Sequence, residues 1–385
     1  MKPNELINNQ HIFDKNALVK LNQIGLPTKK TESYRHFDIT PLLSDDYNFD
    51  LKNTFQKHEK DKDFITIILK NGLVDLEKSD FSTTIELKNS VKQQRITDNA
   101  LYYLSETFLE NEQTIFIKEH LDKPVKIINQ FSGTKGFIPN SLNIIVENDL
   151  HVNIIEIFDD QSLEKSFINA NRTFSISSGA QLNYIKLQDL KHTNSLIINY
   201  IPNIAANALF NIVAIDLGAN VSLNITDTTL HNKKSEYSFH GIIKTHGEQK
   251  SGNIASMHHI KENTTSNFIC KHILKDEASA LFQVSSTVEQ EAKFSKTFQN
   301  SQTILLENGP KINAIPQLIL HTDELEAAHG ATSGSLDQEA LYYLMSRGID
   351  ENVASNMLIK AIELQVINTI TNIQIQEFTL EFLKR

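Results

Sequence analysis

Short apolar runs separated by small polar turns recur through the middle of this chain, and no other feature constrains its fold as strongly. From about residue 114 to residue 320 these runs are typical of β-strands, as in Leu142–Val146 and Val152–Phe158. A glycine or an acidic pair opens several of them, at steps of 39, 29 and 30 residues. Repeats of this length predict a β-solenoid whose coils stack on one another, although a β-sandwich also has turns at regular intervals. The residues that mark these turns are Gly179, Gly218, Gly247 and Glu277.

The segments before and after this region differ from it in character. Phe64–Leu69 predicts a strand that ends in a tight turn at Asn71-Gly72. Asp98–Leu109 has apolar residues at helical spacing, and Asp98 is a suitable N-cap. We therefore expect three parts. These are a mostly helical region with a short strand pair at 1–110, a β core at 111–334 and a helical region at 335–385.

The last fifty residues carry clear helix signals. Ser335-Leu336-Asp337-Gln338 predicts a capping box before a helix over Glu339–Arg347, and Gly348 stands where a helix C′ residue belongs. Asp350 is expected to cap a second helix, and Ile373–Arg385 a further amphipathic element. In the second helix one face is apolar, so that face is expected to pack while the other stays free. Such a tail suits docking to a partner, or capping of the β core. The apolar face comprises Val353, Met357, Leu358, Ala361 and Ile362.

Charge and composition exclude several classes of protein. The 385 residues include 47 acidic and 37 basic side chains, a formal net charge of -10, so we expect no nucleic-acid partner. The opening segment Met1–Gln10 is polar, unlike a signal peptide, and no apolar run is long enough to span a membrane. We expect a cytoplasmic protein without a membrane partner. The single cysteine, Cys270, excludes a disulfide framework within the chain and a cluster held by several of its own thiolates.

Histidines provide the first candidate for chemistry, since no nucleotide-binding, serine-hydrolase or paired-cysteine motif is present. Six of them fall within 42 residues, and neutral imidazole is a common ligand for iron, zinc and copper. Because adjacent residues of a strand face opposite ways, His258 and His259 are not expected to share one site. The pattern fits a metal site, or histidines that are merely buried and hydrogen-bonded or exposed. The six are His231, His240, His246, His258, His259 and His272.

A second candidate follows the apolar strand Pro316–Leu320. Within a few residues come Asp323, Glu324 and then His329, with Gly330 expected to form a sharp turn. A turn histidine can offer one ring nitrogen to a metal or a proton while a carboxylate orients the other nitrogen. A simple hydrogen bond to a backbone carbonyl is equally compatible with this pattern.

The same region resembles the SufB/SufD family of iron-sulfur cluster assembly proteins. The shared order is a proline and an apolar strand, two acids, a His-Gly-Ala-Thr motif, and a helix that ends in Ser-Arg-Gly-Ile. Farther upstream, His258-His259, Lys271 and Gln299 also follow the family outline. The His-Gly-Ala-Thr motif and the single cysteine are similar to the SufD-like branch. In this chain the motifs are Pro316–Leu320, Asp323-Glu324, His329–Thr332, Leu341–Leu344 and Ser346–Ile349.

The resemblance implies a right-handed parallel β-helix flanked by helical regions. It implies an assembly subunit that forms a heterodimer with a SufB-like paralogue and binds a SufC-like ABC ATPase, without catalytic activity of its own. A homodimer is conceivable when the chain is alone. His329 would lie near the paralogue and help to form a transient, shared iron-sulfur cluster or to admit iron, with Asp323, Glu324, Cys270 and His258 as further candidates. The ATPase would dock on Tyr342, Arg347, Val353, Met357 and Leu358.

Three departures and two alternatives accompany this interpretation. Where family members often have a cysteine two residues before the histidine, this chain has Ala327, and both the basic residue often found near Phe294 and the glycine often found near Gln283 differ here. One alternative is a secreted-type β-helix hydrolase or lyase for acidic polysaccharides, which the net negative charge disfavours. The other is a stand-alone metal-binding module built from the histidines of residues 231–272.

Overall fold

A computed structural model describes residues 12–49, 51, 54–55, 61–90, 97–109 and 112–384. The polar opening segment Met1–Gln10 lies outside the described residues. Among the described helices, none combines the length and the apolar character that crossing a bilayer requires.

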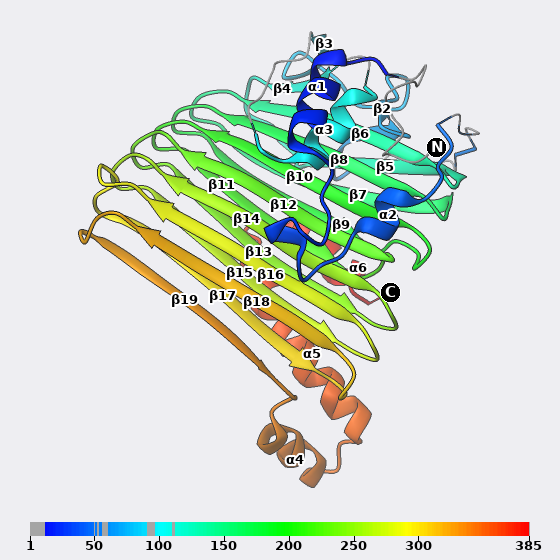
Figure 1. The fold of residues 1–385 in the computed structure, drawn as a ribbon, viewed down its shortest axis with the longest axis vertical. Coiled ribbons are helices and arrows are strands. Elements are labelled where there is room, and N and C mark those ends of the chain that lie inside the picture. The colour runs from blue at the N-terminus through cyan, green and yellow to red at the C-terminus, as the bar shows by residue number, and fades with distance from the viewer. Residues whose placement is uncertain are drawn as a thin grey trace.

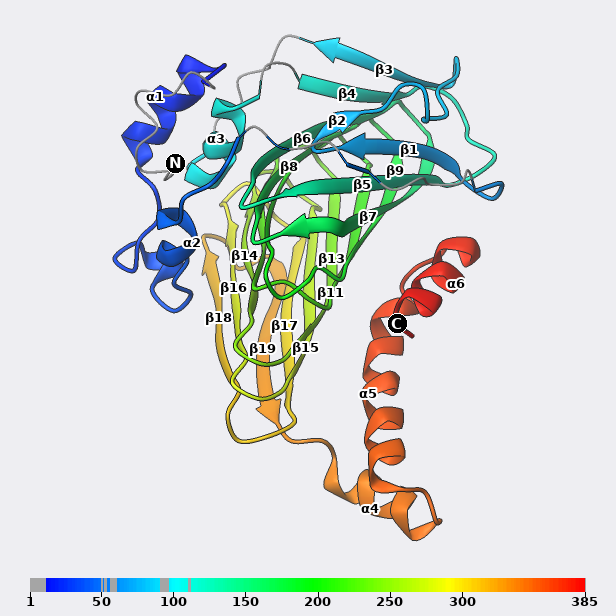
Figure 2. The same cartoon turned by 90° about the vertical axis from the view of Figure 1, so that its right-hand side faces the viewer.

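The core is a flattened parallel β-solenoid of about eight turns, which confirms the predicted mainly β fold (Figures 1 and 2). Each turn contributes one strand to each of two sheets, so a strand pairs with the strand two places farther along the chain. The first sheet contains β5 (Val125–Thr134), β7 (His151–Glu164), β9 (Gln181–Gln188), β11 (Leu209–Asp216), β13 (Glu236–Thr245), β15 (Thr265–Leu274), β17 (Ser295–Leu305) and β19 (Leu325–Gly334). The second contains β4 (Glu112–Ile117), β6 (Phe137–Val146), β8 (Phe167–Ile176), β10 (Ser195–Ile204), β12 (Val221–Leu230), β14 (Lys250–His259), β16 (Ser279–Val288) and β18 (Lys311–Leu320).

Left-handed backbone at the turns explains the spacing seen in the sequence. The turns that lead from the second sheet to the first have a residue with positive φ at each step of 27–31 residues, and a second series occupies the opposite edge. Gly179 belongs to the first series, whereas Gly247 and Asp276 belong to the second. The step of 39 residues from Gly179 to Gly218 therefore compared turns at opposite edges of the solenoid. The repeat along one edge is close to 29 residues. The first series is Asp149, Gly179, Asn207, Lys234, Asn263 and Phe294.

The N-terminal region closes one end of the solenoid and covers the outer face of the second sheet. β1 (Ile65–Lys70) extends the first sheet and turns at Asn71-Gly72 into β2 (Leu73–Val74), as predicted, and β3 (Ile85–Ser90) pairs antiparallel with β4. α3 (Ala100–Thr107) confirms the predicted helix, but its N-cap is Asn99, whose Oδ1 accepts from two backbone amides, and not Asp98. The remaining helices here are α1 (Lys15–Ile24), the 3-10 turn η2 (Glu32–Tyr34) and α2 (Thr40–Ser44).

Three C-terminal helices confirm the predicted helical tail: α4 (Gln338–Ser346), α5 (Glu351–Ile367) and α6 (Ile373–Phe382). Asp337, not Ser335, caps α4, because its Oδ1 accepts from the amides of the two residues that follow Gln338. Asp350 caps α5 and Gly348 has positive φ, both as predicted. Val366 and Ile367 of α5 pack with residues of α6 on the outer face of the first sheet, opposite the N-terminal helices (Figure 2).

The apolar face predicted for α5 is not the face that packs. Val353 is 52% exposed and Met357 is 47% exposed, whereas Ala354 and Glu363 are buried. Lys244 of β13 forms an ion pair with Glu363, with 2.9 Å between Nζ and Oε1, so part of the packing is polar. The expected periodicity was present, but the sheet selects the other side of the helix.

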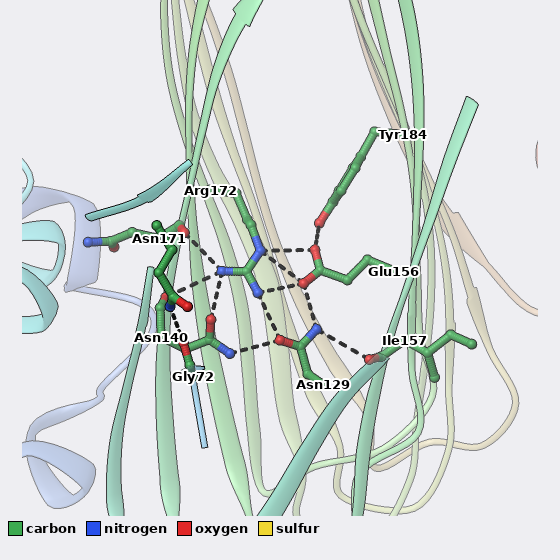
Figure 3. Close-up of polar contacts among 9 residues, drawn as sticks. Gly72, Asn129, Asn140, Glu156, Ile157, Asn171, Arg172 and Tyr184 are labelled. Atoms are coloured by element: carbon green, nitrogen blue, oxygen red, sulfur yellow. Dashed lines mark hydrogen bonds and ion pairs between the residues drawn. The ribbon is translucent and has the colours of Figure 1, made fainter. Parts of the chain in front are cut away.

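The solenoid lumen contains buried ion pairs as well as aliphatic and aromatic side chains. Arg172 of β8 is fully buried, and its guanidinium donates to both carboxylate oxygens of Glu156 on β7 (Figure 3). The same carboxylate accepts from Asn129 and from the Tyr184 hydroxyl, while Asn140 accepts from Arg172. Every charged oxygen is thus hydrogen-bonded, which is the condition under which a buried ion pair is tolerated.

Breaking this pair from one side is expected to destabilise the solenoid. Arg172→Met leaves Glu156 buried without a counter-ion, so the free energy of unfolding should fall by about 3–5 kcal/mol in chemical denaturation. Arg172→Met combined with Glu156→Met removes both charges and should recover most of this loss.

The control is Lys233→Met, which breaks an exposed pair with Glu262 at 2.8 Å and should leave the denaturation midpoint unchanged. A double variant less stable than Arg172→Met alone would contradict the argument.

Candidate functional site at the open end of the solenoid

The C-terminal end of the solenoid is open. β18 and β19 are the last strands of their sheets, and within the described residues each has a strand neighbour on one side only. Neither contains a fully buried residue, unlike β16 and β17 one turn earlier. The open end is therefore a mostly apolar surface flanked by two unpaired strand edges. The inward-facing residues by register are Ile312, Ala314, Pro316, Leu318, Leu320, Leu325, Ala327, His329, Ala331 and Ser333.

His329 lies in the middle of β19, at the mouth of the lumen. The predicted turn is wrong, because Gly330 is paired in strand register with Asn300 and does not have positive φ. His329 is in register with Gln299 of β17, whose side chain is buried in the lumen, and registered residues of parallel strands face the same way. The imidazole is exposed, because among the described residues no further turn of the solenoid covers it.

The acidic residues of this segment do not reach the imidazole. Asp323 and Glu324 occupy the turn between β18 and β19, and Glu324 accepts from Lys293 at 2.6 Å. An extended chain advances about 3.3 Å per residue, which separates Glu324 from His329 by roughly 16 Å along the strand. The expected arrangement, in which a carboxylate orients the histidine, is not formed by these residues.

Cys270 is inside the lumen and away from the surface. It lies on β15 and is fully buried, and its Sγ accepts from Asn253 Nδ2 at 3.1 Å. Burial raises the pKa of the thiol, which disfavours the thiolate needed for metal binding. In register Cys270 is followed by Ser301 and then Ala331, so it is two strand spacings, about 10 Å, inside the open end.

The six histidines of residues 231–272 do not form one site. His258 and His259 face opposite sides of β14, as predicted: His258 contacts Glu289 at 2.6 Å outside, and His259 is buried in the lumen. His231 and His246 are exposed and follow different strands. In the part of the chain that the structure describes, no three side chains of the His, Cys, Asp or Glu type are grouped so as to hold a metal ion.

The lumen next to the open end is lined with hydroxyl, amide and imidazole groups. Both ring nitrogens of His259 are hydrogen-bonded, Nδ1 to Thr264 at 2.7 Å and Nε2 to Ser266 at 2.8 Å. The Ser266 hydroxyl is also hydrogen-bonded to the Thr297 hydroxyl, which in turn donates to Ser286. This network was not among the predicted features of the chain. The sequence does contain an indication of it, because small polar residues occupy every second position of Ser295–Ser301. Polar residues at such positions are normally expected on the solvent-facing side of a strand, but here they face the lumen.

The predicted docking residues lie on the exposed side of α4 and α5. Tyr342 is 74% exposed and contributes with Tyr343 to a shallow depression of about 550 Å³ along α4. The Arg347 guanidinium lies 5.1 Å from the centre of the Tyr343 ring. Met357 is exposed farther along, on α5. Figure 2 shows α4 beyond the ends of the last strands and α5 running back alongside the solenoid toward α6.

Comparison with known proteins assigns the chain to a family. Residues 129–362, more than half of the sequence, match the SufBD core domain of SUF-system iron-sulfur cluster assembly, and residues 5–68 match the SufBD N-terminal region. The chain belongs to the SufBD family. The SufBD core match includes most of the solenoid, the open end, α4 and the first part of α5.

Curated relatives in the SufBD family are distant in sequence. The iron-sulfur cluster assembly protein SufD of Escherichia coli K12 is 23% identical over 89% of this chain and 85% of its own length. SufD of Bacillus subtilis is 31% identical over 38% of this chain and 35% of its own length. SufD of Plasmodium berghei is 27% identical over 50% of this chain, which covers 14% of that protein. Among these three, only the match to the E. coli protein extends over most of both chains.

The buried histidines of this SufBD solenoid should make its stability depend on pH. Burial lowers the pKa of His259 and His272 from 6.5 to about 4. Between these values the unfolded chain binds more protons than the folded chain, so the free energy of unfolding should fall as the pH drops from about 6.5 to about 4. The full fall corresponds to roughly 3 kcal/mol for each histidine.

Urea denaturation across this pH range measures the effect. His272→Gln should flatten the profile by about the contribution of one histidine, while His246→Gln, which removes an exposed imidazole, should leave the profile as it is. Parallel profiles for wild type and His272→Gln would show that His272 is not buried in its neutral form.

Proposed function

We propose that this chain is a non-enzymatic subunit of a SUF assembly complex, paired with a SufB-like paralogue through the open end of its solenoid. The observation that carries the proposal is the unfinished last turn. Unpaired edges of two sheets are templates for further strands, and exposed apolar surface of this kind marks interaction sites. The open end combines both on β18 and β19. Membership of the SufBD family supports a paralogue of similar architecture as the partner.

In this proposal His329 contributes to the assembly site at the interface. Iron, or a nascent iron-sulfur cluster, is the cargo and is held transiently between the two chains. The donor set of this chain is incomplete, because Cys270 is buried and Asp323 and Glu324 are remote from the imidazole. His258 faces away from the lumen and contacts Glu289, so any role for it would be separate from that of His329. Soft thiolate ligands would therefore come from the paralogue.

The exposed side of α4 and α5 is the proposed docking surface for a SufC-like ABC ATPase, which would supply the catalytic activity of the complex. Its aromatic and sulfur-containing side chains are of the types enriched in protein interfaces. The residues concerned are Tyr342, Arg347, Val353, Met357 and Leu358. A cytoplasmic location is part of the proposal, and a single cysteine without a disulfide framework fits it.

The β-helix hydrolase or lyase for acidic polysaccharides is not favoured, because the chain belongs to the SufBD family of iron-sulfur cluster assembly proteins.

The partner claim is tested by Leu318→Asp, which places a charge on the inward face of β18. Burial of a leucine stabilises a contact by about 1.5–3 kcal/mol, and 1.4 kcal/mol is tenfold in affinity, so the Kd for the purified paralogue should rise at least tenfold. Titration calorimetry or gel filtration measures it.

The matched control is Ile319→Asp, which makes the same change on the outward face of the same strand, where Ile319 is 46% exposed. Equal affinities for wild type and Leu318→Asp would refute the interface. Preferential assembly with a second copy of this chain, even with the paralogue present, would replace the heterodimer with a homodimer.

The site claim is tested by His329→Ala in the reconstituted complex. The exposed ring is not part of the core, so the complex should still form, while the yield of cluster, followed by its visible absorbance and by iron content, should fall severalfold. His321→Ala, at an exposed histidine in the turn after β18, is the matched control. Unchanged cluster yield with His329→Ala would exclude a role for this side chain.

A further inference from the structure

Side chains in register on successive strands of this solenoid are repeatedly joined by hydrogen bonds. Asn183 donates to Asn153 at 3.0 Å, and Asn211 donates to Asn183 at 2.9 Å, across β7, β9 and β11. Near the open end Ser266 and Thr297 are joined in the same way at 2.8 Å. Registered side chains lie about 4.8 Å apart at their base, which suits such bonds. Hydrogen bonds between registered side chains on neighbouring strands, here called ladders, therefore recur in this fold.

Gln299 lies on β17, the last strand of the first sheet that has a neighbour on both sides, and it is in register with Phe268 on β15 and His329 on β19. Its side-chain nitrogen donates to the Ser286 hydroxyl at 2.7 Å and to the backbone carbonyl of Gln317 at 2.9 Å. A carbonyl only accepts, so the contact with Gln317 fixes which end of the amide is the NH2 group. The other end, Oε1, is buried and has no hydrogen-bond partner among the described residues.

His329 is the residue in register with Gln299 on the next strand. Both side chains are on the inward side of their strands, and His329 has an exposed ring that can rotate without disturbing the core. A buried carbonyl oxygen without a donor is unfavourable, and a ring N–H is the donor that the ladder position offers. The carboxylates of Asp323 and Glu324, in the turn before β19, are too far along the chain to accept from the His329 ring in place of Gln299.

We propose that Gln299 is a positioning residue, and that its Oε1 accepts a hydrogen bond from Nδ1–H of His329. This contact selects the tautomer in which Nε2 carries the lone pair, directed toward the open end, where it can bind a borderline metal such as iron(II). An amide oxygen here does the work that a carboxylate does at many metal-bound histidines. The inference rests on the proposed role of His329 but concerns the histidine itself, so it can be measured without a cluster.

The experiment uses the full chain labelled with ¹⁵N in its histidines, without partner or metal. His329→Asn identifies the His329 resonances by difference. At about pH 8.5, two units above the ordinary imidazole pKa, the nitrogen shifts report the neutral tautomer. His329 in the wild type is expected to show Nδ1 protonated and Nε2 bare. Wild-type His329 with Nε2 protonated would overturn the proposal, whatever the variants do.

Two variants separate positioning from general structural damage. Gln299→Met keeps the length of the side chain but removes the acceptor, so the Nδ1–H signature should be lost. Gln299→Glu keeps an acceptor oxygen and should retain it. Gln302→Met alters an outward glutamine of the same strand, which accepts from Lys271, and should change nothing at His329. A Gln299→Met protein that retains Nδ1–H would refute the contact.

The outcomes distinguish this inference from the proposed function. If the tautomer depends on Gln299 but His329→Ala assembles clusters normally, the positioning contact stands and the role of His329 in assembly falls. If His329→Ala abolishes cluster formation while the tautomer is indifferent to Gln299→Met, the assembly role stands and this inference falls.

Discussion

The constraint on which the whole structure depends is the parallel register between successive turns. Each strand in the middle of the solenoid satisfies its backbone groups with the strands of the preceding and following turns, so stability is passed from neighbour to neighbour. At the first end the antiparallel strands β2 and β3 terminate the two sheets. At the other end β18 and β19 stop in parallel register with one neighbour each among the described residues. The two unpaired strand edges are thus a consequence of how the fold ends, and the proposed interface depends on them.

The same register determines what the lumen can contain. Inward positions are stacked in rows, so a charged residue in one turn must find its partner in the next turn or across the lumen. Arg172 and Glu156 meet in this way, as do Lys186 and Asp216. Toward the open end the rows change from large apolar side chains to hydroxyls, amides and imidazoles, such as Thr297 and Gln299 on β17. Because buried polar groups need partners, this part of the lumen is a connected network rather than a collection of independent contacts.

Sequence patterns predicted the structure correctly where a residue acts through contacts with its own local backbone. Asp350 and Gly348 mark helix ends through contacts with their own backbone, and both were identified. The length of the solenoid repeat was difficult to recognise in the sequence, because lysine, asparagine and phenylalanine, as well as glycine, occupy its left-handed turn positions. His329 was placed in a turn because Gly330 follows it, yet in a parallel sheet a glycine can simply extend a strand. Which face of α5 packs could not be predicted, since the choice depends on the sheet and not on the helix.

The candidate site was harder to predict than the fold, because its residues are brought together only by the register between strands. Nothing in the local sequence joins Gln299 to His329, thirty positions apart, until the turn length brings them to the same level of adjacent strands. The register also explains why this chain lacks a complete ligand set. The next inward-facing position before His329 on β19 is Ala327, and the row that contains Cys270 ends in Ala331, so neither row brings a thiol to the mouth of the lumen. A lone imidazole surrounded by apolar side chains is a poor metal site but a suitable half of one. In the proposed assembly site the sulfur ligands would therefore come from a different chain, because the only cysteine of this chain is buried and a second copy would not supply one.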